Sequence, residues 1–196
     1  MQTKIIDNVI PKNIQDEIEK AALDIRFPWH FISSSDISSL AYQGYLKEKQ
    51  DLYQDTNIID PPQFFQSLLS DKGEPTFFFG WFAPILDALK FEGMRILRMK
   101  INMTFPYAGS TNLSYGIPHV DLPEEVGYTT GIYYLTDADG DTIIFNEKHG
   151  HQGRLSIQTK VNPKKGKLVL FEGNTLHAPM PTFSNKVRIV LNINFK

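Results

Sequence analysis

The sequence predicts an α+β fold in which helices come first and an antiparallel β core follows. Apolar residues recur with helical spacing in the first third of the chain, and after Gly93 the period of the apolar pattern changes to two. The second half also holds several short strand-like runs separated by turn residues. This order is typical of a jelly roll or sandwich with helices packed on one face.

The first part of the chain, about residues 1–93, is predicted to be a helical and loop support region. A helix is expected between Pro11 and Phe27, because five apolar residues share one helix face there: Ile14, Ile18, Ala21, Ala22 and Ile25. The polar, serine-rich residues 33–60 are expected to be loop with short helical turns.

Two further helices are expected before the β core begins. A short one follows Pro61-Pro62 and buries four apolar residues: Phe64, Phe65, Leu68 and Leu69. Another covers residues 81–90, where Pro84 stands in the first turn and Gly93 lies beyond the end.

The second part, about residues 94–196, is predicted to be the β core. Its first strand covers residues 97–105, where apolar and polar side chains alternate. Further strands are predicted at residues 128–135, 142–146, 155–159, 167–171 and 187–195. No internal repeat or linker interrupts the chain, so residues 1–196 are expected to form a single domain.

Composition excludes several classes of protein. The 196 residues contain no cysteine, which excludes a disulfide framework, a thiolate zinc site and a cysteine nucleophile. The net charge of −2 argues against a nucleic-acid partner, and no apolar run approaches the length of a membrane span. Residues 1–10 carry no export signal, so a cytoplasmic location is expected.

Charge is unevenly distributed in the second half of the chain. Residues 119–147 contain seven acids and no Lys or Arg, whereas residues 148–167 contain six bases and no acid. One interpretation is an ordinary solvated surface of alternating sign. The other is a basic rim that steers an anionic substrate or cosubstrate toward a cleft.

The pattern His119-Val120-Asp121 is a candidate metal site. Residues i and i+2 of a strand point the same way, so this imidazole and this carboxylate can share one ion. His177 follows 56 residues after Asp121, just beyond a predicted strand and its turn. Two histidines and one carboxylate form the facial triad of non-heme Fe(II) oxygenases, which leaves coordination positions open for a cosubstrate and dioxygen.

Arg188 is a candidate anion-binding residue. It follows His177 by 11 residues and lies in an alternating strand, on the face opposite Ile189 and Leu191. If the apolar face packs on the helices, the guanidinium points inward, where it needs an anion. Fe(II), one aspartate, a dicarboxylate and one arginine together carry no net charge. The alternative is an arginine directed outward from a strand that is solvated on one side.

Four segments in this order resemble the Fe(II)- and 2-oxoglutarate-dependent oxygenases, and among them the prolyl-hydroxylase-like branch: HVD (119–121), TGIYYL (130–135), PKKGKLVLF (163–171) and RIVLNINF (188–195). The resemblance covers about residues 95–196. It implies a double-stranded β-helix, a distorted jelly roll with N-terminal helices supporting one sheet. It also implies a hydroxylase with Fe(II), 2-oxoglutarate as cosubstrate and O2 as oxidant.

The resemblance also implies a role for six residues. The iron ligands are expected to be His119, Asp121 and His177. Arg188 is expected to bind the distal carboxylate of 2-oxoglutarate, and Tyr134 to donate a hydrogen bond to the same group. Asn192, on the same strand face as Arg188, is expected to add a polar contact, while alternation leaves the direction of Asn102 open.

Departures from the family pattern bear on the substrate. Asn194 stands where oxygen-sensing prolyl hydroxylases carry a bulky aromatic residue, and Phe183 stands where nucleic-acid demethylases carry their arginine. A carboxylate at Asp121 argues against the halogenating branch. The expected substrate is a protein side chain of the prolyl type or an amino-acid-like small molecule. A cupin-like metalloenzyme without 2-oxoglutarate and a non-catalytic jelly-roll binding module are the alternatives.

Overall fold

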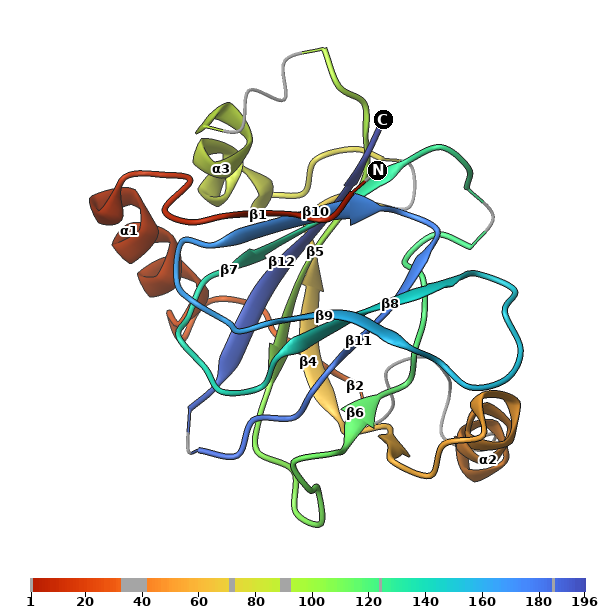
Figure 1. Cartoon of the computed structure of the whole chain (residues 1–196). Helices are drawn as coiled ribbons and strands as arrows, with labels where there is room; N and C mark the ends of the chain where they lie inside the picture. The colour runs from red at the N-terminus through yellow and green to blue at the C-terminus, as the bar shows by residue number, and fades with distance from the viewer. Residues whose placement is uncertain (1, 33–41, 71–72, 89–92, 124, 185) are drawn as a thin grey trace.

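The computed structural model describes residues 2–32, 42–70, 73–88, 93–123, 125–184 and 186–196 (Figure 1). Its helices lie in the first half of the chain: α1 (Lys12–Ala22), α2 (Tyr42–Tyr53), the short 3-10 helix η1 (Phe79–Trp81) and α3 (Ala83–Ala88). Strands make up most of the second half. The predicted class, mostly β with N-terminal helices, is confirmed. None of the helices in the described ranges has the length and apolar character needed to cross a membrane.

Two antiparallel sheets form the β core. The larger sheet has the order β1 (Lys4–Ile6), β10 (Leu168–Glu172), β7 (Thr129–Tyr134), β12 (Arg188–Phe195), β5 (Ile96–Thr104), β4 (Gln63–Ser67) and β2 (His30–Ile32). The smaller sheet has the order β11 (Thr175–Pro179), β8 (Thr142–Lys148) and β9 (Ile157–Val161). A short parallel pair joins β3 (Ile58–Ile59) to β6 (Tyr115–Gly116). In Figure 1 the smaller sheet lies in front of the larger one.

Side-chain alternation divides the larger sheet into two faces. One face packs on α1 and α3 and forms the main apolar core, which includes Ile18, Ala22, Ile85, Leu86, Met99, Ile101, Leu191 and Ile193. The other face meets the smaller sheet through a second buried set: Ile132, Tyr134, Ile144, Val161, Val169, Phe171 and Val190. The expectation that helices support one sheet is therefore correct for α1 and α3.

The helix α2 belongs to a separate apolar cluster. Its Tyr53 is buried with residues of β6, β8 and β11, and Leu46 and Leu52 pack on the same group. The hydroxyl of Tyr115 donates a hydrogen bond of 2.6 Å to Asp55, just after the helix. These contacts hold α2 beside the smaller sheet, away from α1 and α3 (Figure 1).

The helix expected after Pro61-Pro62 is wrong, because that segment forms β4. Phe64 pairs with Met103 of β5, so the larger sheet supplies the hydrogen bonds that a helix would have made internally. Leu68 and Leu69 are buried as expected, whereas Phe64 and Phe65 are half-buried. The support region thus contributes strands to the sheet as well as helices.

Two other N-terminal expectations differ in detail. The polar segment expected to be loop contains the full helix α2, while its residues 33–41 lie outside the described ranges. The helix expected at residues 81–90 is split into η1 and α3, and residues 89 and 90 lie outside the described ranges. Strand β11 lies on a segment where no strand was expected.

Leu191→Ala is expected to lower the free energy of unfolding by about 2–5 kcal/mol. Leu191 is 0% exposed and pairs with Ile101 on one side and Tyr133 on the other, so the lost methyl groups leave a cavity. Urea denaturation measures the change. Ile157→Ala on β9, where the side chain is 49% exposed, is the matched control and should cost less than about 1 kcal/mol. Equal losses in the two variants would contradict this account of the core.

Candidate metal centre

A backbone bridge brings the two predicted histidine ligands together. The amide of His119 donates to the carbonyl of His177 at 3.1 Å, and the amide of His177 donates to the carbonyl of His119 at 3.0 Å. His177 lies in β11, and His119 lies in the segment between β6 and β7. The bridge places the two rings side by side, with their centroids 4.7 Å apart.

The third predicted ligand lies on the same side of this bridge. His119, Asp121 and His177 offer ligand atoms that all lie within 4.8 Å of one another. Nδ1 of His119 bonds the carbonyl of Ile117 at 2.8 Å, and Nδ1 of His177 bonds the carbonyl of Thr175 at 3.3 Å. These bonds leave Nε2 of each ring for an ion, as second partners of metal-bound histidines do.

The residues present fit a metal ion. Nε2 of His177 is buried, lies 4.0 Å from Oδ2 of Asp121, and has no hydrogen-bond partner in the described part of the chain. A buried ring nitrogen without a partner is unfavourable unless a ligand occupies it. Burial lowers the pKa of His177 to about 4, so its ring is neutral at pH 7 and offers a lone pair.

Two residues that the sequence reasoning did not place at the metal site hold Asp121. Nη1 of Arg98 donates to Oδ1 at 2.8 Å, and Nδ2 of Asn194 donates to Oδ2 at 3.0 Å. Burial by itself would raise the pKa of Asp121, but the positive charge of Arg98 outweighs it and the pKa lies well below its usual range. The carboxylate is therefore in the anionic form that a metal requires.

Alternation contained a signal for Arg98. Arg98 and Asn194 are directly paired across β5 and β12, on the face opposite the helices. Arg98 and Arg188 both occupy polar positions of strands whose apolar faces pack on helices, so alternation predicts an inward direction for both side chains. Asn194 thus has a defined contact at the position where the family pattern has an aromatic residue.

Arg188 is buried, as predicted, with an exposed fraction of 3%. Its Nη2 donates to Oγ1 of Thr142 at 2.6 Å, and the hydroxyl of Tyr134 donates to the same oxygen at 2.7 Å. Because Oγ1 of Thr142 accepts both bonds, its own proton is available to a ligand. Nε of Arg188 is buried without a partner in the described part of the chain, so it too can donate to an anion.

Burial lowers the pKa of Arg188, and a bound anion would stabilise its charged form. Thr142 was not among the predicted site residues. Nothing in the sequence around it signals this role, because it only begins a predicted strand. Tyr134 lies behind Thr142, with the guanidinium 5.7 Å from its ring centroid.

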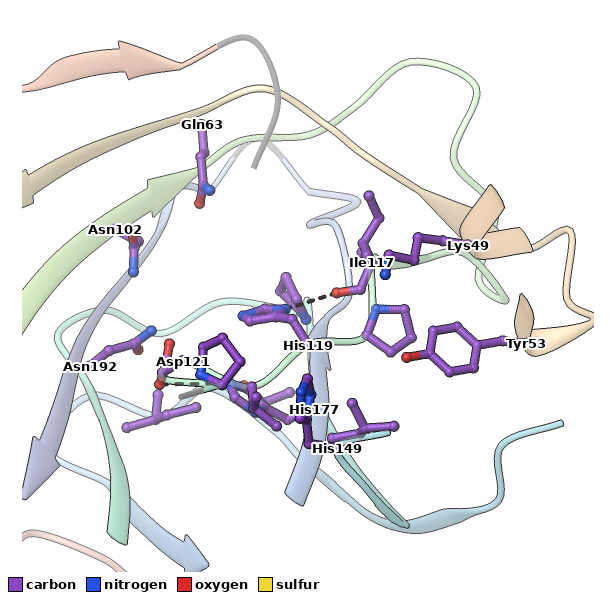
Figure 2. A pocket seen from close by; sticks show the side chains of 18 of the residues that line it. Lys49, Tyr53, Gln63, Asn102, Ile117, His119, Asp121, His149, His177 and Asn192 are labelled. Carbon is purple, nitrogen blue, oxygen red and sulfur yellow. Dashed lines mark hydrogen bonds and ion pairs between the residues drawn. The ribbon is translucent and has the colours of Figure 1, made fainter. Parts of the chain in front are cut away.

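One cavity of about 520 Å³ is lined by the triad and by Arg188. Figure 2 shows the triad in this cavity. His119, Asp121, His177, Arg188 and Asn192 all line it. The amide oxygen of Asn192 is buried and has no partner among the described residues. The structure therefore gathers five of the six predicted site residues around one space, and Tyr134 supports it through Thr142.

In the described structure, the six bases of residues 148–167 are absent from the lining of this cavity. Lys148 pairs with Glu172 at 2.9 Å, and Lys165 pairs with acids of α1. Of the acid-free run, the segment from His149 to Gln152 reaches the cavity. These ion pairs favour the ordinary surface interpretation for Lys148 and Lys165.

The free energy of unfolding of the metal-free protein is expected to fall by about 3 kcal/mol as the pH falls from 6.5 to 4. The unfolded chain protonates His177 near pH 6.5, whereas the folded chain resists protonation until about pH 4, so acid favours the unfolded state. Urea denaturation across this range measures the loss. His177→Gln should remove this part of the slope, and equal slopes in the two proteins would contradict a buried neutral ring.

No family model matches the sequence, and no curated protein matches it either. Solved structures do match its fold. An oxidoreductase of the 2OG-Fe(II) oxygenase family from Burkholderia pseudomallei aligns with a TM-score of 0.60 and 12% identity, over 99% of this chain and 84% of that one. The non-heme alpha-ketoglutarate-dependent epimerase SnoN from nogalamycin biosynthesis aligns with a TM-score of 0.63 and 10% identity, over 98% of this chain and 77% of that one.

A prolyl hydroxylase from Trichoplax adhaerens, solved with a hypoxia inducible factor peptide, aligns with a TM-score of 0.57 and 14% identity, over 98% of this chain and 82% of that one. These likenesses confirm the predicted double-stranded β-helix. The chain has the fold of the Fe(II)- and 2-oxoglutarate-dependent oxygenases, prolyl hydroxylases included.

Proposed function

We propose that this protein is an Fe(II)- and 2-oxoglutarate-dependent oxygenase that uses O2 as oxidant. One observation carries the proposal: three metal-ligating side chains and a buried arginine face the same cavity. Iron binds to neutral imidazoles and to an anionic carboxylate. A guanidinium cation binds a carboxylate through charge-assisted hydrogen bonds. The fold likeness supports the proposal, because SnoN was also solved with Fe3+ and alpha-ketoglutarate.

The ligands would be His119, Asp121 and His177. Oδ1 of Asp121 is engaged by Arg98. Oδ2 accepts from Asn194 and lies 4.0 Å from Nε2 of His177, so Oδ2 would be the oxygen presented to the ion. Ligation through one oxygen leaves the coordination positions that a cosubstrate and dioxygen need. Arg98 and Asn194 are positioning residues in this proposal, since they orient the carboxylate without touching the substrate.

The distal carboxylate of 2-oxoglutarate would bind at Arg188 and Thr142. Nε of Arg188 and the hydroxyl of Thr142 are the donors left available by the hydrogen bonds already made. Tyr134 fixes Thr142 from behind, and Asn192 is placed to add a polar contact along the same strand face. When bound, iron and 2-oxoglutarate would activate O2, the oxidant, and 2-oxoglutarate would be oxidised to succinate and CO2. The chain itself supplies binding, orientation and exclusion of water.

Hydroxylation is the proposed reaction, on a protein side chain of the prolyl type or an amino-acid-like small molecule. The solved structures with this fold include an epimerase and a prolyl hydroxylase, so the fold alone does not choose between reactions. Asn194 bears on this choice. It occupies the position of the aromatic residue that lines the substrate site of oxygen-sensing prolyl hydroxylases, and here it bonds Asp121. This favours the small-molecule substrate.

Asp121→Ala and His177→Ala are each expected to abolish conversion of 2-oxoglutarate to succinate. Anaerobic mixing of the wild-type protein with Fe(II) and 2-oxoglutarate should give a weak visible charge-transfer band, and both variants should lack it. Lys160→Gln, an exposed change on β9, is the control. Full activity in both ligand variants would refute the assignment. A cupin-like enzyme without 2-oxoglutarate, or a binding module, would give no band in any protein.

Arg188→Ala is expected to raise the 2-oxoglutarate concentration needed for half-maximal turnover by roughly a hundredfold while sparing Fe(II) binding, because it removes a charged hydrogen-bond donor. Thr142→Val, which removes the hydroxyl and keeps the shape, should raise it about tenfold. Steady-state kinetics and metal titration measure both effects, and thermal unfolding checks that each variant is folded. Unchanged cosubstrate affinity in Arg188→Ala would exclude its proposed role.

A further inference from the structure

The cavity-facing side of β5 is polar along the length of the strand. Arg98, Lys100, Asn102 and Thr104 all line the cavity, while Met99 and Ile101 between them belong to the apolar core under the helices. The triad and Arg188 account for Arg98 and for the cosubstrate, but they leave Lys100 and Asn102 without a function. The amide oxygen of Asn102 is buried, and a buried polar atom is unfavourable unless something binds it.

Asn102 and Asn192 are acceptors that a ligand would satisfy. Asn192 pairs with Lys100 across β12 and β5, and Asn102 pairs with Val190 one row further along. The amide oxygens of both asparagines are buried and have no hydrogen-bond partner in the described part of the chain. In Figure 2 both side chains lie on one side of the triad, together with Gln63. Ligand N–H or O–H groups are the chemical match for such oxygens.

The ammonium of Lys100 is held inside this same region. It lies over the ring of Phe65 at 4.4 Å from the centroid, a cation–π contact that fixes the flexible side chain. Phe65 pairs with Asn102 across β4 and β5, so the ammonium leans over the row that contains Asn102. A positive charge and two amide oxygens therefore share one wall of the cavity.

The charge of the lining is strongly positive. Among the described residues that line the cavity, four are cationic (Lys49, Arg98, Lys100 and Arg188) and Asp121 is the one carboxylate. Fe(II) and the 2-oxoglutarate dianion carry equal and opposite charges, so loading the site leaves this excess unchanged. Figure 2 shows Lys49 across the triad from the asparagines, which extends the positive potential through the cavity. Such a potential selects anions even in a protein whose net charge is −2.

From these contacts we propose that the substrate is a small-molecule acid whose carboxylate or phosphate is bound by Lys100 and whose hydroxyl or ammonium donors are bound by Asn102 and Asn192. This inference rests on the proposed oxygenase function and names its substrate class. Lys100, Asn102 and Asn192 line the cavity from the paired strands β5 and β12. A small ligand that enters the cavity fits this placement better than a peptide lying across its mouth.

The test is a calorimetric titration of the anaerobic protein loaded with Fe(II) and 2-oxoglutarate. The probes are matched pairs: amino and hydroxy acids with their carboxamides, and sugar phosphates with their parent sugars. At least one acid is expected to bind, and its neutral partner to bind at least tenfold more weakly. The two sets of pairs distinguish a carboxylate from a phosphate. Perturbation of the charge-transfer band by the same acid is an independent readout of its place beside the iron.

Variants of Lys100 then locate the binding. Lys100→Gln is expected to weaken the acid roughly tenfold to a hundredfold, Lys100→Arg to keep most of the affinity, and the control Lys160→Gln to leave it unchanged. Thermal unfolding confirms that each variant is folded. Should Lys100→Gln not fold, Asn102→Asp, which places a negative charge on the same wall, is expected to weaken the acid by a similar factor.

Several outcomes would overturn the inference. The first two are neutral partners that bind as tightly as the acids, and an acid affinity that is the same in Lys100→Gln as in the wild type. The other two are a protein that binds acidic peptides but no small acid, and a protein that binds Fe(II) and 2-oxoglutarate but none of the acids. Failure to bind Fe(II) and 2-oxoglutarate in the first place would instead contradict the proposed function.

Discussion

Two backbone hydrogen bonds between His119 and His177 are the constraint on which the site depends. They join residues far apart in the chain, and they orient both rings before any ion is bound. Asp121 follows two residues after His119 and reaches the same point because its backbone continues from this bridge. If the bridge were absent, no local feature of either segment would hold the three side chains within range of one ion.

Burial of charge explains the surroundings of the triad. Asp121 is anionic although its side chain is only 2% exposed, and it remains so because Arg98 and Asn194 bond its two oxygens. Arg188 is the opposite case, since it has a hydroxyl partner but no acid bonded to it in the described part of the chain. One buried charge is thus compensated by the protein, whereas the other is left for a ligand.

The two faces of the larger sheet have different roles: the face toward the helices carries the apolar core, and the opposite face carries the polar residues of the site. Positions on the helix side of β5 and β12 are apolar and supply most of the main core. Positions on the other side carry Arg98, Lys100, Asn102, Arg188, Asn192 and Asn194. Successive side chains point to opposite faces, so a one-residue slip of register would move the charged side chains to the face under α1 and α3. The same slip would place apolar side chains in the cavity. The pairing register of β5 with β12 therefore underlies both the fold and the cavity.

Much of this arrangement was predictable from the sequence. Alternation identified β5 and β12 within a residue or two and turned Arg188 inward, and the spacing of His119, Asp121 and His177 indicated a shared ion before any contact was known. The inward direction of Arg188 and the shared side of His119 and Asp121 rest on local geometry, since a strand has a fixed two-residue period. The role of His177 was implied by the family resemblance, because its contact with His119 is long-range.

Only the tertiary structure decided which strands pair and what each inward side chain touches. Residues 63–67 became a strand rather than a helix because β5 offered an edge for pairing, and no periodicity in that short apolar segment distinguishes the two states. Arg98 and Asn194 meet Asp121, and Thr142 meets Arg188, through pairings between distant segments. The sequence by itself therefore determined the face on which each polar residue lies, whereas the long-range register decided its partners, because local patterns carry no information about which strands become neighbours.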